Sequence, residues 1–375
     1  MTGVAGAPPM LRRAHIDLGA ISANVEHVAR SVAPAAVMAV VKADGYGHGA
    51  VETARAALEG GATSLGVADV TEGLALRDAG IEAPVLAWLH GAHPVFDEAV
   101  AHDITLGIST RGQLAAAIEA GSAGRPARLH LKIDTGLGRN GFERSDWEPA
   151  FAEARRGVDD GRILVEGLFS HLSNASDDDD RAQLAAFEEA TAAARAAGLE
   201  PTVRHLASTA GALRLPETRL DQVRLGIGQY GLSPYDGVGS AELGLRPALR
   251  LETRLISVKR VAAGTGVSYG YTYRPEEDTW LGLVPLGYAD GIPRHVSNRG
   301  SVWVGGRVRP IVGRVAMDQF VVDLGRERAE VGDRVVLFGD PAEGFPSADD
   351  WAEAASTINY EIVTRLGGRV KRVYG

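Results

Sequence analysis

The chain has 375 residues, of which 45% are hydrophobic and 23% charged, as is typical of a globular protein with about two domains. A formal net charge of −9 without any basic stripe argues against binding to nucleic acid. Cysteine is absent, so disulfides, thiolate metal sites and a catalytic thiol are excluded.

The N-terminal sequence indicates neither export nor membrane insertion. The first residues, MTGVAGAPPMLRR, contain no apolar core long enough for a signal peptide, and residues 1–10 are expected to form a frayed terminus. No run of about 18 apolar residues occurs in the chain, so a membrane span is not expected. We therefore expect a cytoplasmic protein with no membrane partner.

The first two thirds of the chain alternate between apolar and helix-like segments. Residues 14–18 are predicted as a short strand and residues 22–32 as a helix. Further strands are predicted at 37–42, 64–68, 85–89, 105–108, 129–134, 164–171, 203–207 and 223–227. Helices are predicted between them, for example at 50–58, 71–79, 112–120 and 182–197. The four consecutive aspartates at 177–180 are predicted as a solvated loop, because adjacent carboxylates without ligand spacing make a poor metal cage.

Helices between apolar strands predict parallel βαβ units, and about eight such units predict an α/β fold with a (β/α)8 TIM-type barrel. In this fold the functional residues lie at the C-terminal ends of the strands. Residues at or near such ends are Lys42, Lys132, His171, Ser208 and Arg224.

After about residue 234 the pattern becomes mostly β. Residues 249–261 alternate charged and apolar side chains, and strand-like runs follow at 279–285, 301–304, 307–312, 320–324 and 334–338. One helix is predicted at 347–357 with Ser347 as its N-cap. We therefore expect a barrel domain at 11–240 and a β-rich C-terminal domain at 241–375, with the first residues as candidates to join the second domain.

One stretch, VVKADGYGHG at 40–49, carries the strongest chemical signal. A lysine that follows a buried strand loses part of its hydration, which lowers its pKa and makes Lys42 a usable nucleophile or Schiff-base former. The alternative is that Lys42 only extends its ammonium out of the core to water. The stretch by itself does not decide between these two interpretations.

The segment KADGYGHG at 42–49 resembles the cofactor-lysine motif of the alanine racemases, enzymes that use pyridoxal 5'-phosphate (PLP). Later segments resemble the same family in the same order, so the resemblance covers nearly the whole chain. They are LKIDTGLGRNG (131–141), SHLSNASD (170–177), HLASTAGAL (205–213), VRLGIGQYGLSP (223–234), VSYGYTY (267–273), PLGYADG (285–291), VGRVAMDQ (312–319) and TINYE (357–361).

The resemblance assigns roles to individual residues. It implies that Lys42 carries PLP as a Schiff base and that Tyr269 is the second catalytic base. The implied cofactor contacts are Lys42, Tyr46, His171, Ser208, Thr209, Arg224, Gly226, Ile227 and Tyr360. The implied substrate contacts are Arg139, Met317, Asp318 and Tyr288, and no metal is expected. Lys132 matches a lysine that many members carry in carbamylated form, which would hold Arg139 in place.

Two positions depart from the family pattern, and a third bears on its mechanism. Ser208 replaces the usual Asn, while Thr209 replaces the usual Ser and keeps a hydroxyl for phosphate. Arg224 matches the family's arginine beside the pyridine nitrogen. An arginine does not give up its proton, so the ring would be a weaker electron sink and racemisation would be favoured over transamination.

The resemblance implies two-base racemisation of L-alanine and D-alanine, supplying D-alanine for cell-wall peptidoglycan. It also implies a homodimer in which Lys42 of one subunit faces Tyr269 and Met317 of the other. Three alternatives remain: a racemase of broader specificity, a PLP decarboxylase of the same architecture, and a non-catalytic PLP-carrying protein. The decarboxylases use a cysteine that this chain lacks, and the non-catalytic proteins resemble the barrel half alone.

Overall fold

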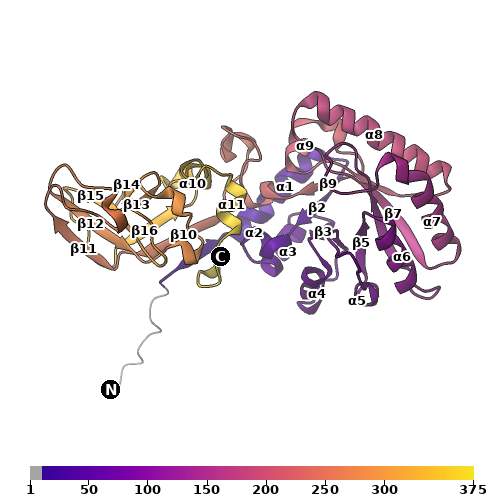
Figure 1. Ribbon diagram of the computed structural model, residues 1–375, viewed down its shortest axis with the longest axis horizontal. Helices are drawn as coiled ribbons and strands as arrows, with labels where there is room; N and C mark the ends of the chain where they lie inside the picture. Colours follow the sequence, from indigo (N-terminus) through magenta and orange to yellow (C-terminus); the bar gives the residue numbers. More distant parts are fainter. Residues whose placement is uncertain (1–10) are drawn as a thin grey trace, which may run out of the picture.

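The computed structural model describes residues 11–375, which form two lobes joined side by side (Figure 1). The expected frayed terminus at 1–10 lies outside the described residues. One lobe is a parallel barrel surrounded by helices, and the other is a mostly antiparallel sheet. The predicted fold class, a TIM-type barrel followed by a mostly β domain, is confirmed.

The barrel contains an 8-stranded parallel sheet in the order β8-β7-β6-β5-β4-β3-β2-β9. Its strands are β2 (Ala36–Val40), β3 (Ser64–Val67), β4 (Val85–Ala87), β5 (Ile104–Ile108), β6 (Ala127–Lys132), β7 (Ile163–Phe169), β8 (Val203–His205) and β9 (Gln222–Leu225). A bridge between Ser208 and Arg224 links the two ends of this sheet, so the barrel is nearly closed. All eight strands lie within or next to the segments predicted for them.

Helices follow the strands and cover the barrel, as βαβ connections require. They are α1 (Leu18–Val32), α2 (Lys42–Tyr46), α3 (Ala50–Glu59), α4 (Val70–Asp78), α5 (Asp97–Ala101), α6 (Arg111–Ala120), α7 (Trp147–Asp159), α8 (Asp177–Ala196) and α9 (Thr209–Arg214). Side chains of the preceding residues cap several of them: Asp17 accepts from the backbone N–H of Ala20, and Thr110 from that of Gln113.

Two local predictions for the barrel are wrong. The aspartates at 177–180 are not a solvated loop but the first turn of α8, capped by Ser176. Their charge suits the positive end of the helix dipole, and Asp180 is buried because it accepts from Ser173 and Asn174. The strand predicted to reach Lys42 ends at Val40, and Lys42 instead begins α2.

The second lobe contains a 9-stranded sheet in the order β11-β12-β15-β14-β13-β16-β10-β1-β17. Its strands are β1 (Arg13–Ile16), β10 (Leu249–Arg254), β11 (Ser257–Val261), β12 (Thr279–Val284), β13 (Ser301–Val304), β14 (Arg307–Val312), β15 (Phe320–Gly325), β16 (Arg334–Phe338) and β17 (Lys371–Tyr374). Helices α10 (Ala348–Ala355) and α11 (Asn359–Thr364) lie beside the junction with the barrel (Figure 1). Ser347 caps α10 as predicted, accepting from the backbone N–H of Asp350 at 2.9 Å.

The two lobes share a hydrophobic core. One core cluster fills the barrel, but a second one joins barrel residues such as Tyr46 and Tyr230 to residues of the sheet lobe such as Leu251 and Ile362. Strand β1 precedes the barrel in sequence yet pairs with β10 and β17. The described part of the chain therefore starts in the sheet lobe with β1, continues through the barrel and returns to the sheet lobe.

Candidate active site

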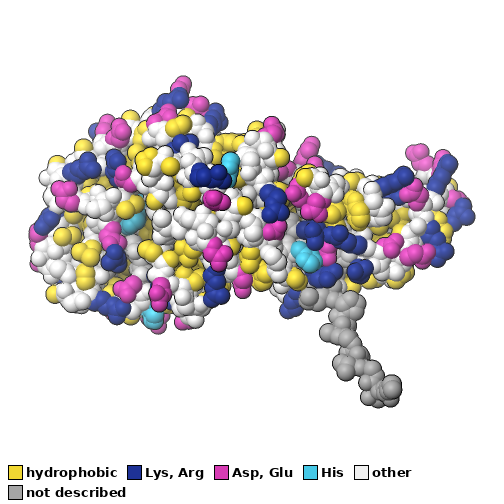
Figure 2. All heavy atoms as spheres, turned by 180° about the vertical axis from the view of Figure 1, so that it is seen from behind, with side chains coloured by type: hydrophobic (Ala, Val, Ile, Leu, Met, Phe, Trp, Pro, Cys, Tyr) yellow, Lys and Arg dark blue, Asp and Glu magenta, His cyan; other side chains and the backbone are white. Residues whose placement is uncertain are grey.

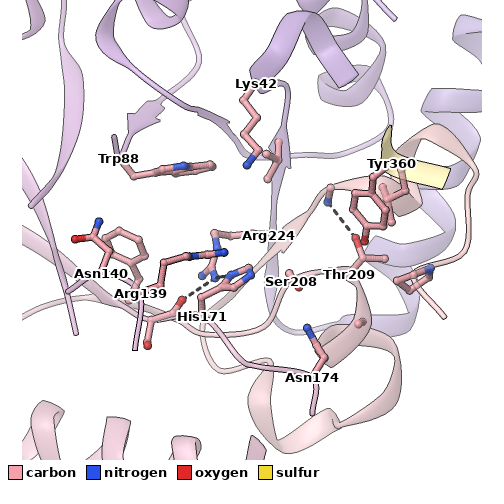
Figure 3. A pocket seen from close by; sticks show the side chains of 18 of the residues that line it. Lys42, Trp88, Arg139, Asn140, His171, Asn174, Ser208, Thr209, Arg224 and Tyr360 are labelled. Carbon is pink, nitrogen blue, oxygen red and sulfur yellow. Dashed lines mark hydrogen bonds between the residues drawn. The ribbon is translucent and has the colours of Figure 1, made fainter. Parts of the chain in front are cut away.

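A cavity of about 1190 Å³ opens at the C-terminal ends of the barrel strands (Figure 3). Eleven of the residues singled out from the sequence line it: Lys42, Tyr46, Lys132, Arg139, His171, Ser208, Thr209, Arg224, Gly226, Ile227 and Tyr360. They come from the ends of several different strands and, for Tyr360, from α11 of the other lobe. The barrel thus concentrates these side chains where its strands end.

Lys42 stands at the start of an unusual left-handed turn. The next five residues, 43–47, have φ values of 53°, 53°, 60°, 52° and 81°, a conformation that residues other than glycine rarely adopt. The Glu72 carboxylate accepts from the backbone N–H of Ala43 at 2.8 Å and supports the turn. The Lys42 side chain extends into the cavity, with Nζ 6.0 Å from the ring centre of Trp88 (Figure 3).

The surroundings of Lys42 favour its neutral amine. Burial lowers its pKa, the positive charges of Arg139 and Arg224 lower it further, and Glu72 acts in the opposite direction. A lysine in this environment is a better nucleophile and base than one in water. The structure therefore places Lys42 in the cavity, and its ammonium does not simply extend to solvent.

Hydroxyl and amide groups gather at one side of the cavity. The hydroxyl of Thr209 accepts from the backbone N–H of Gly226 at 3.1 Å and of Gly228 at 3.4 Å. Ile227 begins the short helix η3 (Ile227–Tyr230), where backbone N–H groups lack partners within the helix. A Cβ added at Gly226 would lie 2.9 Å from the Tyr46 hydroxyl, so only glycine leaves this side open.

The tyrosine hydroxyls on this side remain protonated. Burial raises the pKa of Tyr46 to about 12 and also raises the pKa of Tyr360. The two rings lie 6.2 Å apart between centroids. Together with the backbone N–H of Ile227 at the start of η3, they form a set of hydrogen-bond donors of the kind that binds a phosphate group.

Arg224 lies deep in the cavity and is held by backbone oxygens. Its guanidinium donates to the carbonyls of Ser170 at 2.7 Å, Leu206 at 2.9 Å and His205 at 3.0 Å. The same group lies 3.1 Å from Nδ1 of His171 (Figure 3). Burial lowers the pKa of Arg224 to about 10, so it stays charged at neutral pH. Burial and the charge of Arg224 lower the pKa of His171 to about 3, so this ring is neutral.

Two cations, Lys132 and Arg139, face the cavity from β6 and the segment after it. Burial, followed by the charges of Arg139 and Arg224, lowers the pKa of Lys132 to about 8. Nζ of Lys132 lies 5.8 Å from the ring centre of Phe169. This corner therefore carries an excess of positive charge, which suits a substrate carboxylate.

Four residues singled out from the sequence do not line the cavity of this chain. Tyr269, Met317 and Tyr288 lie on the sheet lobe with 70%, 54% and 42% of their surfaces exposed. Asp318 pairs with Arg369, with 2.8 Å between Oδ1 and the guanidinium nitrogen. One copy of the chain thus brings together the barrel residues and Tyr360 but leaves the four C-terminal residues at a separate surface.

Several cavity residues were not found from the sequence. They include Trp88, Asn140, Phe169, Asn174 and Tyr235. Trp88 and Phe169 fall within predicted strands near their ends, so their place in a barrel was a usable signal. Asn174 and Tyr235 belong to loops, whose course the apolar pattern does not predict.

Other kinds of site receive no support from the described residues. Among residues 11–375, no group of three or more His, Asp or Glu side chains is arranged to hold a metal ion. Over the same range, every helix is too short or too polar to cross a bilayer.

Two family models match this chain in succession. Residues 16–234 match the N-terminal domain of alanine racemase, and residues 248–374 match its C-terminal domain. The alanine racemase of Thermobifida fusca is 52% identical over 365 residues, covering 96% of this chain and 97% of that protein.

Solved structures of alanine racemases are also similar to this chain. The crystal structure of alanine racemase from D-cycloserine-producing Streptomyces lavendulae superposes with a TM-score of 0.94 at 49% identity, covering 98% of each chain. The enzyme from Corynebacterium glutamicum superposes with a TM-score of 0.85 at 35% identity, covering 97% of this chain and 99% of the other.

Proposed function

Since the chain belongs to the alanine racemase family, we propose that it is an isomerase that interconverts L-alanine and D-alanine. One observation carries the proposal beyond the family match. The cavity combines a lysine of lowered pKa, an arginine for a carboxylate and a group of phosphate-type donors within one space of about 1190 Å³.

We further propose pyridoxal 5'-phosphate as the cofactor, because the residues present fit it. Lys42 would hold it through Nζ, and Thr209, Tyr46, Tyr360 and the backbone N–H of Ile227 would bind its phosphate. The open side at Gly226, which a Cβ would fill, leaves room for that group. When bound, this cofactor supplies an electron sink that stabilises negative charge at the substrate α-carbon.

The cations of the cavity orient the reactants. Arg139 would bind the alanine carboxylate, since its planar fork matches two oxygens. Arg224 keeps its proton because its pKa of about 10 lies well above neutral pH, and three carbonyls fix its orientation, so it would donate to the cofactor ring without protonating it. His171, neutral beside Arg224, would pack against the ring.

Two proton-transfer groups are required, because racemisation removes a proton from one face and returns one to the other. The Lys42 amine serves one face, and its lowered pKa favours the unprotonated base. Tyr269 would serve the other, but it is 70% exposed and does not line this chain's cavity.

We propose that the protein is a homodimer in which the partner subunit supplies the second proton-transfer group. Tyr269 of the partner subunit would face Lys42, and the partner's Met317, Asp318 and Tyr288 would complete the substrate end. Tyr269, Tyr288 and Met317 are exposed, and tyrosine and methionine are enriched in such interfaces. The resulting crowding would favour the methyl side chain of alanine over longer ones. The proposed role is to supply D-alanine for peptidoglycan in the cytoplasm.

Chiral analysis tests the function. The purified protein, loaded with PLP, is incubated with L-alanine or D-alanine, and optical rotation is followed to equilibrium. We expect both solutions to reach zero rotation and the Lys42→Ala variant to leave them unchanged. Serine and lysine serve as separate arms for broader specificity, and CO₂ release for decarboxylation. Release of CO₂ from alanine, or an optical rotation that stays constant in the presence of the loaded protein, would exclude the proposal.

A further inference from the structure

A buried chain of three histidines and one arginine runs from the cavity into the barrel. His171 Nδ1 lies 3.1 Å from the Arg224 guanidinium, which also lies 3.0 Å from Nδ1 of His205 (the cavity end is visible in Figure 3). Nε2 of His205 in turn lies 2.8 Å from Nδ1 of His130. This series of side chains ends at His130 on β6, a residue that no motif singled out.

Donor and acceptor chemistry fixes where the protons are. A guanidinium only donates, so Nδ1 of His205 must accept and its proton must lie on Nε2. That Nε2–H then donates to Nδ1 of His130, whose own proton must also lie on Nε2. The same reasoning applied to the other side of Arg224 places the proton of His171 on Nε2. All three imidazoles therefore share one tautomer, and the hydrogen bonds run outward from Arg224, to His171 on one side and through His205 to His130 on the other.

Packing alone does not explain why this series of polar side chains is buried in the barrel. Barrel interiors are ordinarily filled by branched apolar side chains, yet His205 is 0% and His130 is 7% exposed. The sheet makes room for His130: a Cβ at Gly167 would lie 2.8 Å from its ring, and the β6–β7 register shifts between Leu129 and His130. His205 is fixed further by Phe169, with ring planes inclined by 2° and centroids 4.9 Å apart.

We propose that His130 and His205 are positioning residues that hold Arg224 in its place in the cavity. His130 accepts the Nε2–H of His205 and so keeps Nδ1 of His205 free to accept from Arg224. Without that acceptor, His205 would turn its ring or move its proton to Nδ1, and two N–H groups would then point at each other. Arg224 would lose this bond and part of its fixed orientation.

The charges around the chain support the neutral state of both histidines. Burial and the charges of Arg128 and Arg224 lower the pKa of His130 to about 4. Burial, followed by Arg224 and His130, lowers the pKa of His205 well below its usual value. A second positive charge beside Arg224 is therefore avoided at neutral pH.

Nitrogen NMR of the protein with ¹⁵N-labelled histidine tests the proposal directly, with PLP bound and without it. We expect His130, His205 and His171 each to show a protonated Nε2 and an unprotonated Nδ1 at pH 7. A protonated Nδ1 on His205, or a doubly protonated ring on His130 or His205, would overturn the assignment.

Two variants separate positioning from packing. His130→Asn keeps an acceptor near the position of Nδ1, whereas His130→Leu fills similar space without one. We expect the Leu variant to give mixed His205 tautomers and to bind PLP roughly 10-fold more weakly, since a buried donor is left unpaired. The Asn variant should restore the tautomer and most of the affinity. His102→Asn, on the exposed surface, is the matched control and should change neither.

Equal PLP affinity in the Leu and Asn variants, at whatever level, would contradict the proposal. If the Leu variant does not fold, the tautomers of the unaltered protein and of the Asn variant decide. The catalytic meaning of the inference rests on the proposed function, but the NMR measurement does not. Tautomers as described with no racemisation would refute only the function, and racemisation with a different His205 tautomer would refute only the inference.

Discussion

The ring of Tyr46 stacks on the ring of Tyr230, with centroids 4.9 Å apart and planes inclined by 28°. The Tyr230 hydroxyl donates to the carbonyl of Val40 at 3.0 Å, so this pair ties the turn that follows Lys42 to strand β2. Both rings are buried in the core that the two lobes share. Tyr46 thus has two separable roles, one in its ring and one in its hydroxyl.

Tyr46→Phe should separate these roles. The ring and its stacking remain, so we expect the free energy of unfolding to change by less than about 1 kcal/mol. Loss of one hydrogen bond to a charged phosphate should weaken PLP binding roughly 10-fold. Tyr46→Ala should in addition destabilise the fold by about 3–5 kcal/mol, as removal of a buried aromatic side chain does. PLP titration and urea unfolding measure the two effects, and unchanged PLP affinity in the Phe variant would remove the hydroxyl from the site.

Tyr269→Phe should abolish one of the two proton transfers while leaving the fold intact, since this side chain is 70% exposed. Racemisation should fall about 10²–10⁴-fold. In D₂O the variant should still exchange the α-hydrogen of D-alanine slowly through Lys42 and retain its configuration, while L-alanine exchanges far less. Proton NMR on each enantiomer reads this directly. Equal exchange of both enantiomers would end the assignment of the two bases.

Mixing two variants of strongly reduced activity should restore activity if subunits share their sites. Lys42→Ala removes the base of the barrel, and Tyr269→Phe removes the base of the sheet lobe. A hybrid dimer of the two then contains one intact site made from the unaltered half of each subunit. We expect activity to reappear after subunit exchange, with exchange verified by mass-tagged subunits. Hybrids that form but stay inactive would show that Tyr269 acts within its own chain or not at all.

Lys132 should be carbamylated in the folded protein. It is 8% exposed, its pKa is lowered to about 8, and Arg139 and Arg224 contribute to that shift. A neutral amine attacks CO₂ and forms a carbamate with release of one proton to solvent, and the resulting anion would relieve the repulsion among these cations. Electron density at Nζ in a crystal is the measurement, because the adduct is easily lost in mass spectrometry. A bare ammonium beside a chloride would contradict the prediction.

Lowering the pH from 7 to 5 should decrease the free energy of unfolding. Burial lowers the pKa of His48 and of His130 to about 4, whereas the unfolded chain titrates near 6.5. The unfolded state therefore binds more protons between these values, and stability present above pH 6.5 is lost as the pH falls toward 4. We expect a loss of about 1–2 kcal/mol per histidine between pH 7 and 5 in urea unfolding. His130→Asn should reduce the slope by about one proton, and a slope of the opposite sign would refute this account.

The sequence predicted the barrel from local patterns, and it predicted the cavity residues partly from strand ends and otherwise from the family resemblance. Buried parallel strands read as short apolar runs, and their C-terminal ends locate residues such as His171 and Arg224. Strands of the sheet lobe were also predicted from local patterns. For example, the predicted strand 301–304 is found unchanged as β13.

What the pattern missed depends on contacts far apart in sequence. His130 and His205 are separated by 75 residues, and nothing local marks either as part of a chain. The aspartates at 177–180 were misjudged because their composition resembles a loop, while their role as a helix start depends on Ser176 before them. The apolar pattern does not predict that Tyr269 lies away from the cavity of its own chain; only the family resemblance implied this, by placing the residue opposite Lys42 of a partner subunit.

The left-handed turn at 43–47 also has a consequence for how the protein is made. Such a backbone is strained and persists only where its surroundings hold it. One of those contacts is the bond from Arg372 of β17 to the carbonyl of Gly47 at 3.0 Å, across 325 residues. Because translation proceeds from the N-terminus, the segment around Lys42 leaves the ribosome long before Arg372 exists. The backbone that carries Lys42 therefore depends on a contact with the last strand of the chain, which is synthesised long after it.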